Sequence, residues 1–356
     1  MFRDQPAQIL VLLRSRSAGE KMVNIGGRPV IASKSDSPSS NPREAHPRDT
    51  LKLVLAFAAI YLVWGSTYLA IRYAVETIPP LVTAAIRHTI AGSVMLAWAY
   101  VRGYRAKREH WIAGAVVGAF FFLIGHGSLH WAELHVASGL AALLIATEPM
   151  FILVLAWASR QQRISRLSAL GLAVGVVGVA ILTGVEVLSK DASLLGLLAV
   201  LAGSLSWAAG VVISAKVKLP SDALARTAVP LVCGAAMLMI ASLVTGEFHD
   251  LHGSAISLKS ILGLGYLIVF GSIVAFTAYT WLLQRCPPTL VATHTYANPV
   301  IAVLLGWLIA SEPLTARVAL ASVAILGAIV LIRRGEHVKK VPISAAREAE
   351  TCEQCA

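Results

Sequence analysis

The feature that most constrains this sequence is a series of long apolar runs, which begins at Lys52 and continues almost to the end of the chain. A helix rises 1.5 Å per residue, so a run of about 20 residues matches a hydrocarbon core about 30 Å thick. Because the runs lack the period-two alternation of barrel strands, and because lipid offers no partners to backbone groups, we expect each run to be a helix. We count ten, with approximate limits 53–74, 81–101, 111–131, 137–158, 167–187, 194–216, 223–245, 260–283, 289–310 and 315–332.

Composition supports this interpretation. Of 356 residues, 57% are hydrophobic and only 14% are charged, and the mean hydropathy of +0.72 exceeds that of ordinary soluble domains. The sequence therefore predicts an all-α integral membrane protein whose main partner is the lipid bilayer. The net charge of +11 lies mostly in the tails and short connections. It indicates membrane topology, and nucleic acid is not an expected partner.

The four cysteines are too scattered to indicate a disulfide framework. Cys352 and Cys355 have the spacing of metal ligands, but no second pair of ligands accompanies them, and unpaired tail thiols are the simpler interpretation. No metal and no cofactor is therefore expected.

Positive residues in the connections predict the orientation of the chain. If the N-terminus is cytoplasmic, one set of connections holds Arg102, Arg105, Lys107, Arg108, Arg160, Arg163, Arg166, Lys216, Lys218, Arg226 and Arg285. The opposite set holds only Arg72, Lys190, Lys259 and Arg317, and it carries Glu76, Glu133, Glu186, Asp191, Glu247, Asp250 and Glu312. We therefore expect a multi-pass protein of the plasma (inner) membrane with both termini in the cytoplasm.

The second half of the chain repeats part of the first. Residues 119–182 align with residues 269–332 without a gap, which matches Trp131 to Trp281, Pro149 to Pro299 and Trp157 to Trp307, together with Phe120 to Phe270, Leu140 to Leu290 and Leu155 to Leu305. With five helices in each copy, an odd number, the second copy enters the membrane in the opposite sense. Such inverted repeats predict a substrate site near the membrane midplane and alternating access to its two faces.

The predicted domains follow from the repeat. Residues 1–50 are rich in Ser, Pro, Arg and Lys and are interpreted as a disordered cytoplasmic tail. Residues 51–188 form the first five-helix repeat, and residues 189–333 form the second. Residues 334–356 form a cytoplasmic C-terminal tail.

Each repeat carries a proline inside an apolar run, Glu148-Pro149 in the first and Asn298-Pro299 in the second. Such a proline releases the carbonyl four residues earlier, which is tolerable only against protein or a wet cavity. Helix breaks at matching positions in inverted halves point to a transporter's binding site, although both prolines could also be kinks that serve packing. By helical rise, Glu148 lies about 17 Å from one face and Asn298 about 13 Å from the other, so both lie near one level.

A carboxylate at the depth of Glu148 costs several kcal/mol if it is charged and unpaired. Glu148 is therefore a candidate for contact with a substrate amine or for proton coupling, and a structural hydrogen bond is the alternative. Arg87, about 10 Å deep, pairs with Glu148, holds the other end of a zwitterion, or extends to the interface. His126 and His294 are more compatible with a cavity than with lipid, and with Glu148 they form a candidate proton path.

Several deep aromatic residues complete the expected site. Trp64 and Trp207 occupy comparable places in the first helix of each copy, and Tyr296 also lies deep. The expected substrate contacts are therefore Trp64, Tyr68, Arg87, His126, Glu148, Trp207, His294, Tyr296 and Asn298. Gly171, Gly175 and Gly178 lie on or near one face of the fifth helix and are interpreted as sites of close packing.

Five segments together resemble a known family, the drug/metabolite transporter superfamily in its EamA-domain branch. They are Trp64-Gly65-Ser66-Thr67-Tyr68, Ala85-Ile86-Arg87, Glu148-Pro149, Asn298-Pro299 and Ser311-Glu312-Pro313-Leu314-Thr315. The resemblance covers about residues 52–333 and implies a bundle of two inverted five-helix EamA repeats that exports amino acids or related small metabolites. One departure is Gln161-Gln162-Arg163-Ile164, where the family usually has a stretch like Gly-Glu-Arg. This departure lies in a connection rather than at the expected site.

The leading functional prediction is a secondary active transporter, an exporter of a small-molecule substrate, with protons as the expected coupling ion. Efflux of hydrophobic cations by a carboxylate among aromatic rings is the alternative within transport. A membrane-embedded enzyme or a lipid-handling protein is the alternative of another class, disfavoured because the ionisable groups are spread across both leaflets. No enzymatic activity is expected, and assembly as a homodimer is left open.

Overall fold

The computed structural model describes residues 22–25, 28–31, 47–160, 163–186, 193–251, 255–283, 285–286, 291 and 293–337. Internal contacts divide the chain into two units, Met1–Thr50 and Leu51–Ala356. In the first unit, strands β1 (Met22–Ile25) and β2 (Arg28–Ile31) pair in antiparallel fashion. Most of the tail predicted for residues 1–50 lies outside the described residues, so its disorder stays a prediction.

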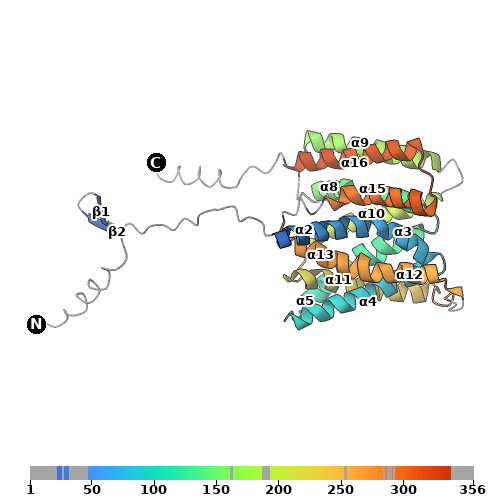
Figure 1. Ribbon diagram of the computed structural model, residues 1–356, viewed down its shortest axis with the longest axis horizontal. Coiled ribbons are helices and arrows are strands. Elements are labelled where there is room, and N and C mark those ends of the chain that lie inside the picture. Colours follow the sequence, from blue (N-terminus) through green and yellow to red (C-terminus); the bar gives the residue numbers. More distant parts are fainter. Residues whose placement is uncertain are drawn as a thin grey trace, which may run out of the picture. The chain divides into compact units, whose positions relative to one another are not determined.

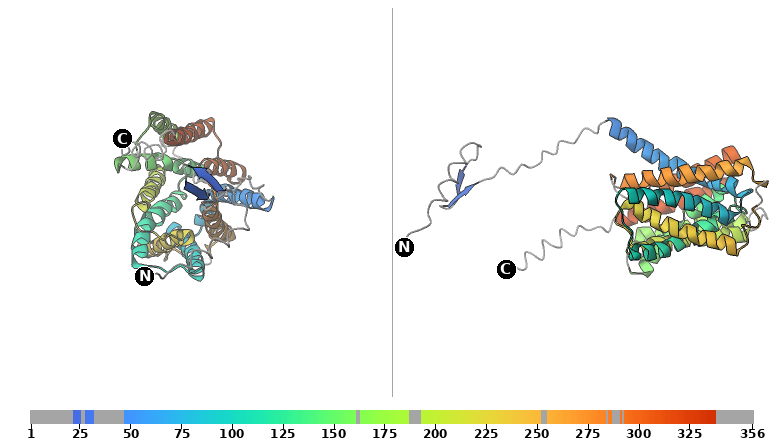
Figure 2. Two further views of the ribbon diagram at one scale, coloured as in Figure 1. Left: turned by 90° about the vertical axis from the view of Figure 1, so that its left-hand side faces the viewer. Right: turned by 90° about the horizontal axis from the view of Figure 1, so that it is seen from below.

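The second unit is a helical bundle whose elements follow the predicted apolar runs (Figures 1 and 2). In chain order they are α2 (Pro47–Ala58), η1 (Ala59–Val63) and α3 (Trp64–Val75); α4 (Pro80–Val101); α5 (Arg108–Gly118), η2 (Ala119–His126) and α6 (Gly127–Ala132); α7 (Ser138–Ile145) and α8 (Glu148–Ala158); α9 (Arg166–Glu186); α10 (Leu194–Ser214); α11 (Ala223–Val244); α12 (Leu258–Tyr266), η4 (Leu267–Val274) and α13 (Ala275–Leu283); α15 (His294–Ala310); and α16 (Ala316–His337).

The helical membrane architecture is confirmed for the second unit. Among the described residues, eight helices are long and apolar enough to cross a membrane, and two further apolar segments, Arg166–Leu182 and His294–Ala310, are shorter. The count of ten spanning helices and the inverted relation of the repeats stay predictions.

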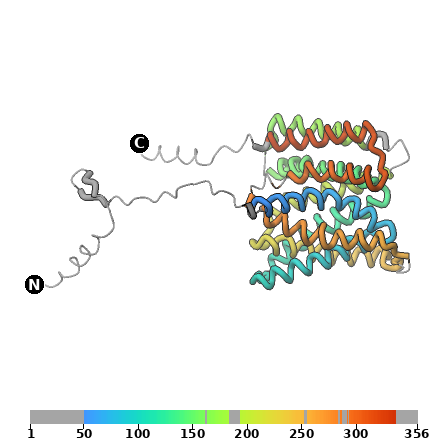
Figure 3. The backbone as a smooth tube through the Cα atoms, viewed as in Figure 1, coloured from blue at the N-terminus to red at the C-terminus, as the bar shows by residue number. Residues whose placement is uncertain are grey.

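The bundle has two ends, which we name by their charged residues (Figure 3). At the glutamate end, α3 ends and α4 and α7 begin, and the connections there carry Glu133, Glu247 and Glu312. At the arginine end, α10 ends, α11 begins and α16 ends, with Arg226 and Arg333 in these last two helices. The larger buried apolar cluster lies toward the glutamate end, where α3, α6, α7, α10 and α16 meet.

Helices α9 and α16 form a closely packed pair at one side of the bundle (Figure 1). A Cβ atom on Gly171 would lie 2.8 Å from the Ala328 carbonyl oxygen, and one on Gly178 would lie 2.9 Å from Ile325. Side chains larger than hydrogen would force the two helices apart. The prediction that glycines on this face allow close packing is therefore confirmed.

Two π-helical segments occupy similar places in the two halves of the chain. Residues 119–126 form η2, and a shift of 150 residues places them at 269–276, within two residues of η4. Carbonyl groups in both segments accept hydrogen bonds from other helices: Ser206 Oγ donates to the Phe120 carbonyl at 2.8 Å, and Trp64 Nε1 donates to the Gly271 carbonyl at 3.1 Å. The irregular backbone is thus bonded within the protein.

The two prolines behave differently. At Pro149 the fourth apolar run is broken, because α7 ends at Ile145 and α8 begins at Glu148. The Thr147 hydroxyl donates to the Leu144 carbonyl at 2.6 Å and so satisfies one group at the break. At Pro299, in contrast, α15 continues without a break. The proline is the sixth residue of this helix, and it removes the helical hydrogen bond to the Thr295 carbonyl without ending the helix.

Candidate functional site: a central cavity

A cavity of about 580 Å³ lies inside the bundle, large enough for a small metabolite. Eight of the nine side chains predicted as substrate contacts line it: Trp64, Tyr68, Arg87, His126, Glu148, Trp207, His294 and Asn298. The ninth, Tyr296, is not among the lining residues and packs against the apolar cluster toward the glutamate end. The sequence therefore located the cavity, while the binding roles of these residues stay a prediction.

The cavity extends toward one end of the bundle only. Toward the glutamate end its lining stops at Ile71, Leu129 and Ala142, which border the buried apolar cluster. Toward the arginine end it continues past Ser214 to Arg226 and Arg333. Since Arg226 is exposed, the cavity reaches the surface at the arginine end and is closed at the glutamate end.

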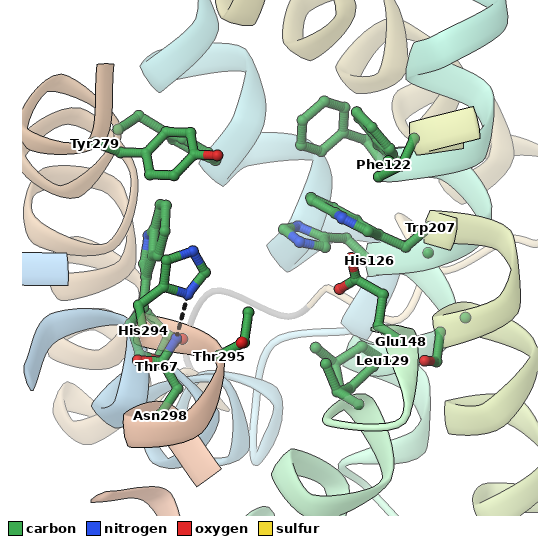
Figure 4. A pocket seen from close by; sticks show the side chains of 18 of the residues that line it. Thr67, Phe122, His126, Leu129, Glu148, Trp207, Tyr279, His294, Thr295 and Asn298 are labelled. Carbon is green, nitrogen blue, oxygen red and sulfur yellow. Dashed lines mark hydrogen bonds between the residues drawn. The ribbon is translucent and has the colours of Figure 1, made fainter. Parts of the chain in front are cut away.

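One wall is a stack of aromatic rings from η2 and α10 (Figure 4). Trp207 lies between Phe121 and His126, with ring centroids 4.4 Å and 5.1 Å away and interplanar angles of 23° and 16°. Stacking on both faces fixes the indole in one orientation. The edges of these rings are therefore the part of this wall that a ligand can touch.

The facing wall comes from α3, α13 and α15 (Figure 4). Trp64 makes edge contacts with Phe276 and His294, at centroid distances of 5.5 Å and 4.9 Å, and a tilted contact with Tyr279 at 5.3 Å. Because the Trp64 N–H donates to Gly271, this indole offers the cavity only its apolar ring. The cavity is thus bounded on two sides by aromatic surface.

Glu148 and Arg87, two charged groups of the cavity, are not paired with each other. Glu148 lies at the helix break, and within the described part of the chain its carboxylate makes neither a hydrogen bond nor an ion pair. Arg87 is 3% exposed, and its Nε donates to Ser272 Oγ at 3.1 Å. The salt bridge between Glu148 and Arg87 considered from the sequence is absent from the described residues, so both groups remain available to a ligand.

Three histidines extend from the cavity into the protein. His126 lines the cavity, and its Nδ1 lies 2.8 Å from Nε2 of His88, which is fully buried. Nδ1 of His130 lies 2.7 Å from the His126 carbonyl and must carry the hydrogen, since a carbonyl only accepts. Among the described buried atoms, His88 Nδ1 and His130 Nε2 have no hydrogen-bond partner. We find no cluster of metal-ligating side chains in the described residues.

The side-chain amide of Asn298 is hydrogen-bonded within the protein. In the amide orientation that satisfies both of its polar atoms, the nitrogen donates to the carbonyls of Ile60, Tyr61 and His294 at 3.3, 3.2 and 3.0 Å. The first two belong to the π-helical segment η1. The amide therefore ties α15 to irregular backbone in the first run, and only its oxygen is left for His294 or a ligand.

Sequence reasoning missed several polar contributors to the cavity. Among them are Arg226, Arg333 and Tyr279, and serine and threonine residues also line it. Both arginines lie near helix ends, where a positive residue is typical of membrane topology, and nothing local distinguishes one that faces a cavity. Tyr279 lies fifteen positions before His294 in the chain, and only packing brings the rings to 5.8 Å. The spacing of residues in the sequence therefore did not predict that Tyr279 lines the cavity.

Comparison with known proteins identifies the family. The EamA-like transporter family matches residues 51–184 and 194–334, almost the whole helical part. The chain belongs to the EamA-like transporter family. It is 36% identical over 294 residues to "Uncharacterized inner membrane transporter YedA" of Escherichia coli (strain K12), covering 82% of this chain and 93% of the relative. The drug/metabolite transporter resemblance is thereby confirmed.

A more distant relative is also named as a transporter, and a solved structure has the same fold. The chain is 25% identical to "Uncharacterized transporter YoaV" of Bacillus subtilis (strain 168), covering 79% of this chain and 94% of the relative. A solved crystal structure with 21% identity matches 82% of this chain and 99% of its own, with a TM-score of 0.56, and shows the same fold. The protein is thus a membrane transporter of the EamA family, a multi-pass protein of the inner membrane.

Proposed function

We propose that this EamA protein is a secondary active transporter that exports amino acids or related small zwitterionic metabolites by alternating access. The observation that carries the proposal is a single cavity that holds one carboxylate, Glu148, and one buried guanidinium, Arg87, not paired with each other. A zwitterion carries the two complementary charges. The arginine end faces the cytoplasm in this proposal, because the described Lys and Arg residues concentrate there.

Three observations support two inverted five-helix repeats. The EamA family matches the chain twice, once in each half. The π-helical segments η2 and η4 differ by about the same offset as the matched tryptophans and Pro149/Pro299. Each segment also receives a hydrogen bond at a comparable place, from Ser206 in one half and from Trp64 in the other. Repeats of this kind place the substrate site at their interface, and residues from both halves of the chain line this cavity.

The carboxylate of the substrate binds near Arg87 and His126 in this proposal. If His88 donates through Nε2 to His126 Nδ1, the unpartnered buried atom His88 Nδ1 is a lone pair; in the reverse arrangement it is an N–H. An orphaned buried N–H is the rarer of the two in proteins. The favoured arrangement makes His126 Nε2 an N–H donor, and a donor beside a guanidinium suits a carboxylate.

The ammonium group of the substrate binds at Glu148. A carboxylate inside the bundle without a hydrogen-bonded partner is costly when charged. The charge of Arg333 lies within electrostatic range of Glu148, and in this proposal a substrate ammonium group or a proton binds the carboxylate directly. If the two compete, a proton that enters on the return step drives export of the substrate. Glu148 thereby couples transport to protons, and no second ion is required.

The charges of the cavity argue against hydrophobic cations as the substrate class. Arg87, Arg226 and Arg333 line the same cavity as the single carboxylate of Glu148. A substrate with only positive charge meets three like charges and one opposite charge there, and like charges inside a poorly solvated site repel strongly. A zwitterion meets opposite charge at both of its ends.

The first experiment identifies the substrate. We expect cells without the gene to accumulate a zwitterionic metabolite, detected by untargeted metabolite profiling, and purified protein in liposomes to transport this metabolite along an imposed pH gradient. In the same liposomes, Glu148→Gln should lower pH-driven flux at least tenfold, because the amide binds neither a proton nor an ammonium ion as a counter-charge.

Glu109→Gln is the matched control, because it removes one carboxylate that pairs with Lys218 at the surface, outside the cavity. Its flux should equal that of the unmodified protein. Undiminished flux in Glu148→Gln would refute the coupling role of this residue. Accumulation of lipophilic cations in place of zwitterions would refute the substrate class.

A further inference from the structure

Glu133 is a buried carboxylic acid at the closed end of the bundle. It follows α6 in the connection to α7, and its backbone N–H still bonds to the Leu129 carbonyl at 3.0 Å. Its side chain is buried, with the residue 1% exposed, and neither carboxylate oxygen has a hydrogen-bond partner among the described residues. Its neighbours in the chain, Ala132 and Val136, belong to the buried apolar cluster. The residue lies beyond the membrane-spanning segment Arg108–Ala132.

The charged groups near Glu133 leave its carboxylate unneutralised. Arg72 on α3 directs Nη1 to the backbone carbonyls of Glu133 and Val136, at 3.0 Å and 3.1 Å, and not to the carboxylate. Glu312, just before α16, is a second negative charge within electrostatic range. Tyr68 on α3 is the third titratable neighbour, and it is also influenced by Glu148.

A charged carboxylate without hydrogen bonds is unstable in such surroundings, because burial removes its hydration shell. Burial raises the pKa of the Glu133 carboxyl well above its usual range; the charge of Glu312 raises it further, and Arg72 acts in the opposite direction. The state with the lower desolvation cost is the neutral, protonated acid.

We propose that Glu133 is a proton-binding site that is filled while the glutamate end is closed and exchanges with the outer solution when that end opens. This inference rests on the proposed alternating access, because it needs a second conformation in which the connection between α6 and α7 is hydrated. The ligand is the proton itself. The site is separate from Glu148, which faces the cavity that reaches the arginine end.

The sign of the pH effect follows from linkage. A group whose pKa is higher in the closed form than in the open form binds its proton more tightly when closed, so acid favours closure. Between the ordinary glutamate pKa of about 4.3 and the raised value, each unit of increasing pH lowers the ratio of closed to open protein by up to about tenfold. The glutamate end should therefore open more readily as the outer pH rises.

The two acids then have separate tasks. In this conformation Glu148 meets the solution that enters through the arginine end, and in the proposed conformation with the glutamate end open it takes up the coupling proton from the outer solution. Glu133 responds only to the solution beyond the glutamate end. Tyr68, influenced by both, lies on the helix that also carries Arg72. A proton on Glu133 is needed for closure of the glutamate end, whichever substrate occupies the cavity.

Hydrogen–deuterium exchange of the full chain in lipid nanodiscs tests this proposal without any substrate. The reporter is the start of α7, where Ser138 N and Gly139 N are bonded to Glu312. Between about pH 5.5 and about pH 7.5, after correction for intrinsic exchange, the opening of this segment should rise by up to about tenfold per pH unit. In Glu133→Gln it should remain at the low-pH value throughout.

Two further variants keep the test decisive. Glu133→Met is apolar and of similar size, and its opening should also remain at the low-pH value. It carries the test if the amide of Glu133→Gln disturbs folding. Glu148→Gln should retain the pH dependence of the unmodified protein at this segment. A flat profile in the unmodified protein, or an unchanged slope in both Glu133 variants, would overturn the proposal. Loss of the slope in Glu148→Gln alone would assign the proton to the cavity instead.

The two experiments distinguish failure of the proposed transport function from failure of the proton site at Glu133. If no zwitterionic metabolite is transported but the exchange slope depends on Glu133, the proton site stands and the substrate class is wrong. If flux behaves as proposed and the slope is absent, the proton site is wrong and the transport proposal stands.

Discussion

The two ends of the bundle use their charged side chains in different ways. At the glutamate end, carboxylates bond backbone N–H groups at the starts of helices: Glu312 accepts from Ser138 N and Gly139 N at 2.8 Å and 3.0 Å, and Glu247 accepts from Leu81 N at 2.7 Å. At the arginine end, the pair Lys218–Glu109 joins side chains that are 80% and 42% exposed. Each end also has a contact of the other kind, because Asp222 accepts from Ala225 N at 2.8 Å at the arginine end and Lys259 pairs with Glu76 in solvent at the glutamate end. The difference is that Asp222 caps its own helix, whereas Glu312 and Glu247 cap helices from another part of the chain.

This difference predicts that the arginine end moves more easily than the glutamate end. A carboxylate at a helix N-terminus meets unbonded N–H groups and the positive end of the helix dipole, so it is held by more than its own charge. A solvent-exposed ion pair contributes little. Both capping carboxylates also come from the second half of the chain and bond helices of the first half. Opening the glutamate end must therefore separate the two halves there.

Removal of Glu312 should have the largest effect. In Glu312→Ala, two backbone N–H groups and the Ser138 hydroxyl lose their acceptor. Hydrogen bonds to a charged group are worth about 1.5–3 kcal/mol, so we expect the closed glutamate end to lose about 2–3 kcal/mol. This corresponds to about 30- to 150-fold more frequent opening, measurable as faster deuterium exchange at the start of α7.

The counterpart at the arginine end is Glu109→Ala, which removes an exposed partner of Lys218. Its deuterium exchange at the start of α11 should be unchanged within error. Equal effects of the two variants would mean that the capping bonds are not what distinguishes the ends.

A methyl group at Gly306 should have a smaller effect. A Cβ atom there would overlap the Glu312 carboxylate and lie 3.4 Å from Ser138 Oγ. Gly306→Ala should push this carboxylate away from α7 at a cost of about 1–3 kcal/mol, as overpacking does elsewhere. The measurement is again exchange at Ser138 and Gly139, together with the thermal unfolding midpoint.

Gly327→Ala is the matched control for backbone effects. Gly327 lies inside α16, and no atom within 4 Å would meet its Cβ. Alanine there should leave the glutamate end unchanged and raise helix stability by up to about 1 kcal/mol. A loss of protection in the control of the same size as in Gly306→Ala would assign the effect to helix propensity rather than to Glu312.

Most of the helical fold could be predicted from the sequence because lipid imposes one rule on every span. The predicted run 81–101 became α4 (Pro80–Val101), and the run 223–245 became α11 (Ala223–Val244). A helix is the only way to satisfy the backbone of an isolated apolar run. The difference between Pro149 and Pro299 was not predictable, since each proline removes one helical hydrogen bond and nothing in the local sequence decides whether the helix ends there.

The site residues could be predicted where their depth within a membrane-spanning run was enough to place them in a cavity. Glu148, Arg87 and His126 are polar residues within apolar runs, and such residues face a cavity because lipid offers them no partners. Arg226 and Glu133 are near helix ends, where charge is ordinary, and they were counted only as topology. Their surroundings, a cavity for one and a buried apolar cluster for the other, arise from contacts between distant segments.

The smallest effect belongs to the arginine end, where we expect electrostatic attraction rather than bonding. Arg226 is exposed at the cavity mouth, so Arg226→Gln should raise the KM for an amino acid of net negative charge by about twofold and leave the KM for a zwitterion without net charge unchanged. The difference should vanish at about 1 M salt, where the Debye length falls to about 3 Å. Arg285→Gln is the control, because Arg285 lies at the same end over Trp281, outside the cavity. An effect of Arg226→Gln that persists in high salt would mean that this residue binds the substrate directly, and the arginine end would then hold part of the site.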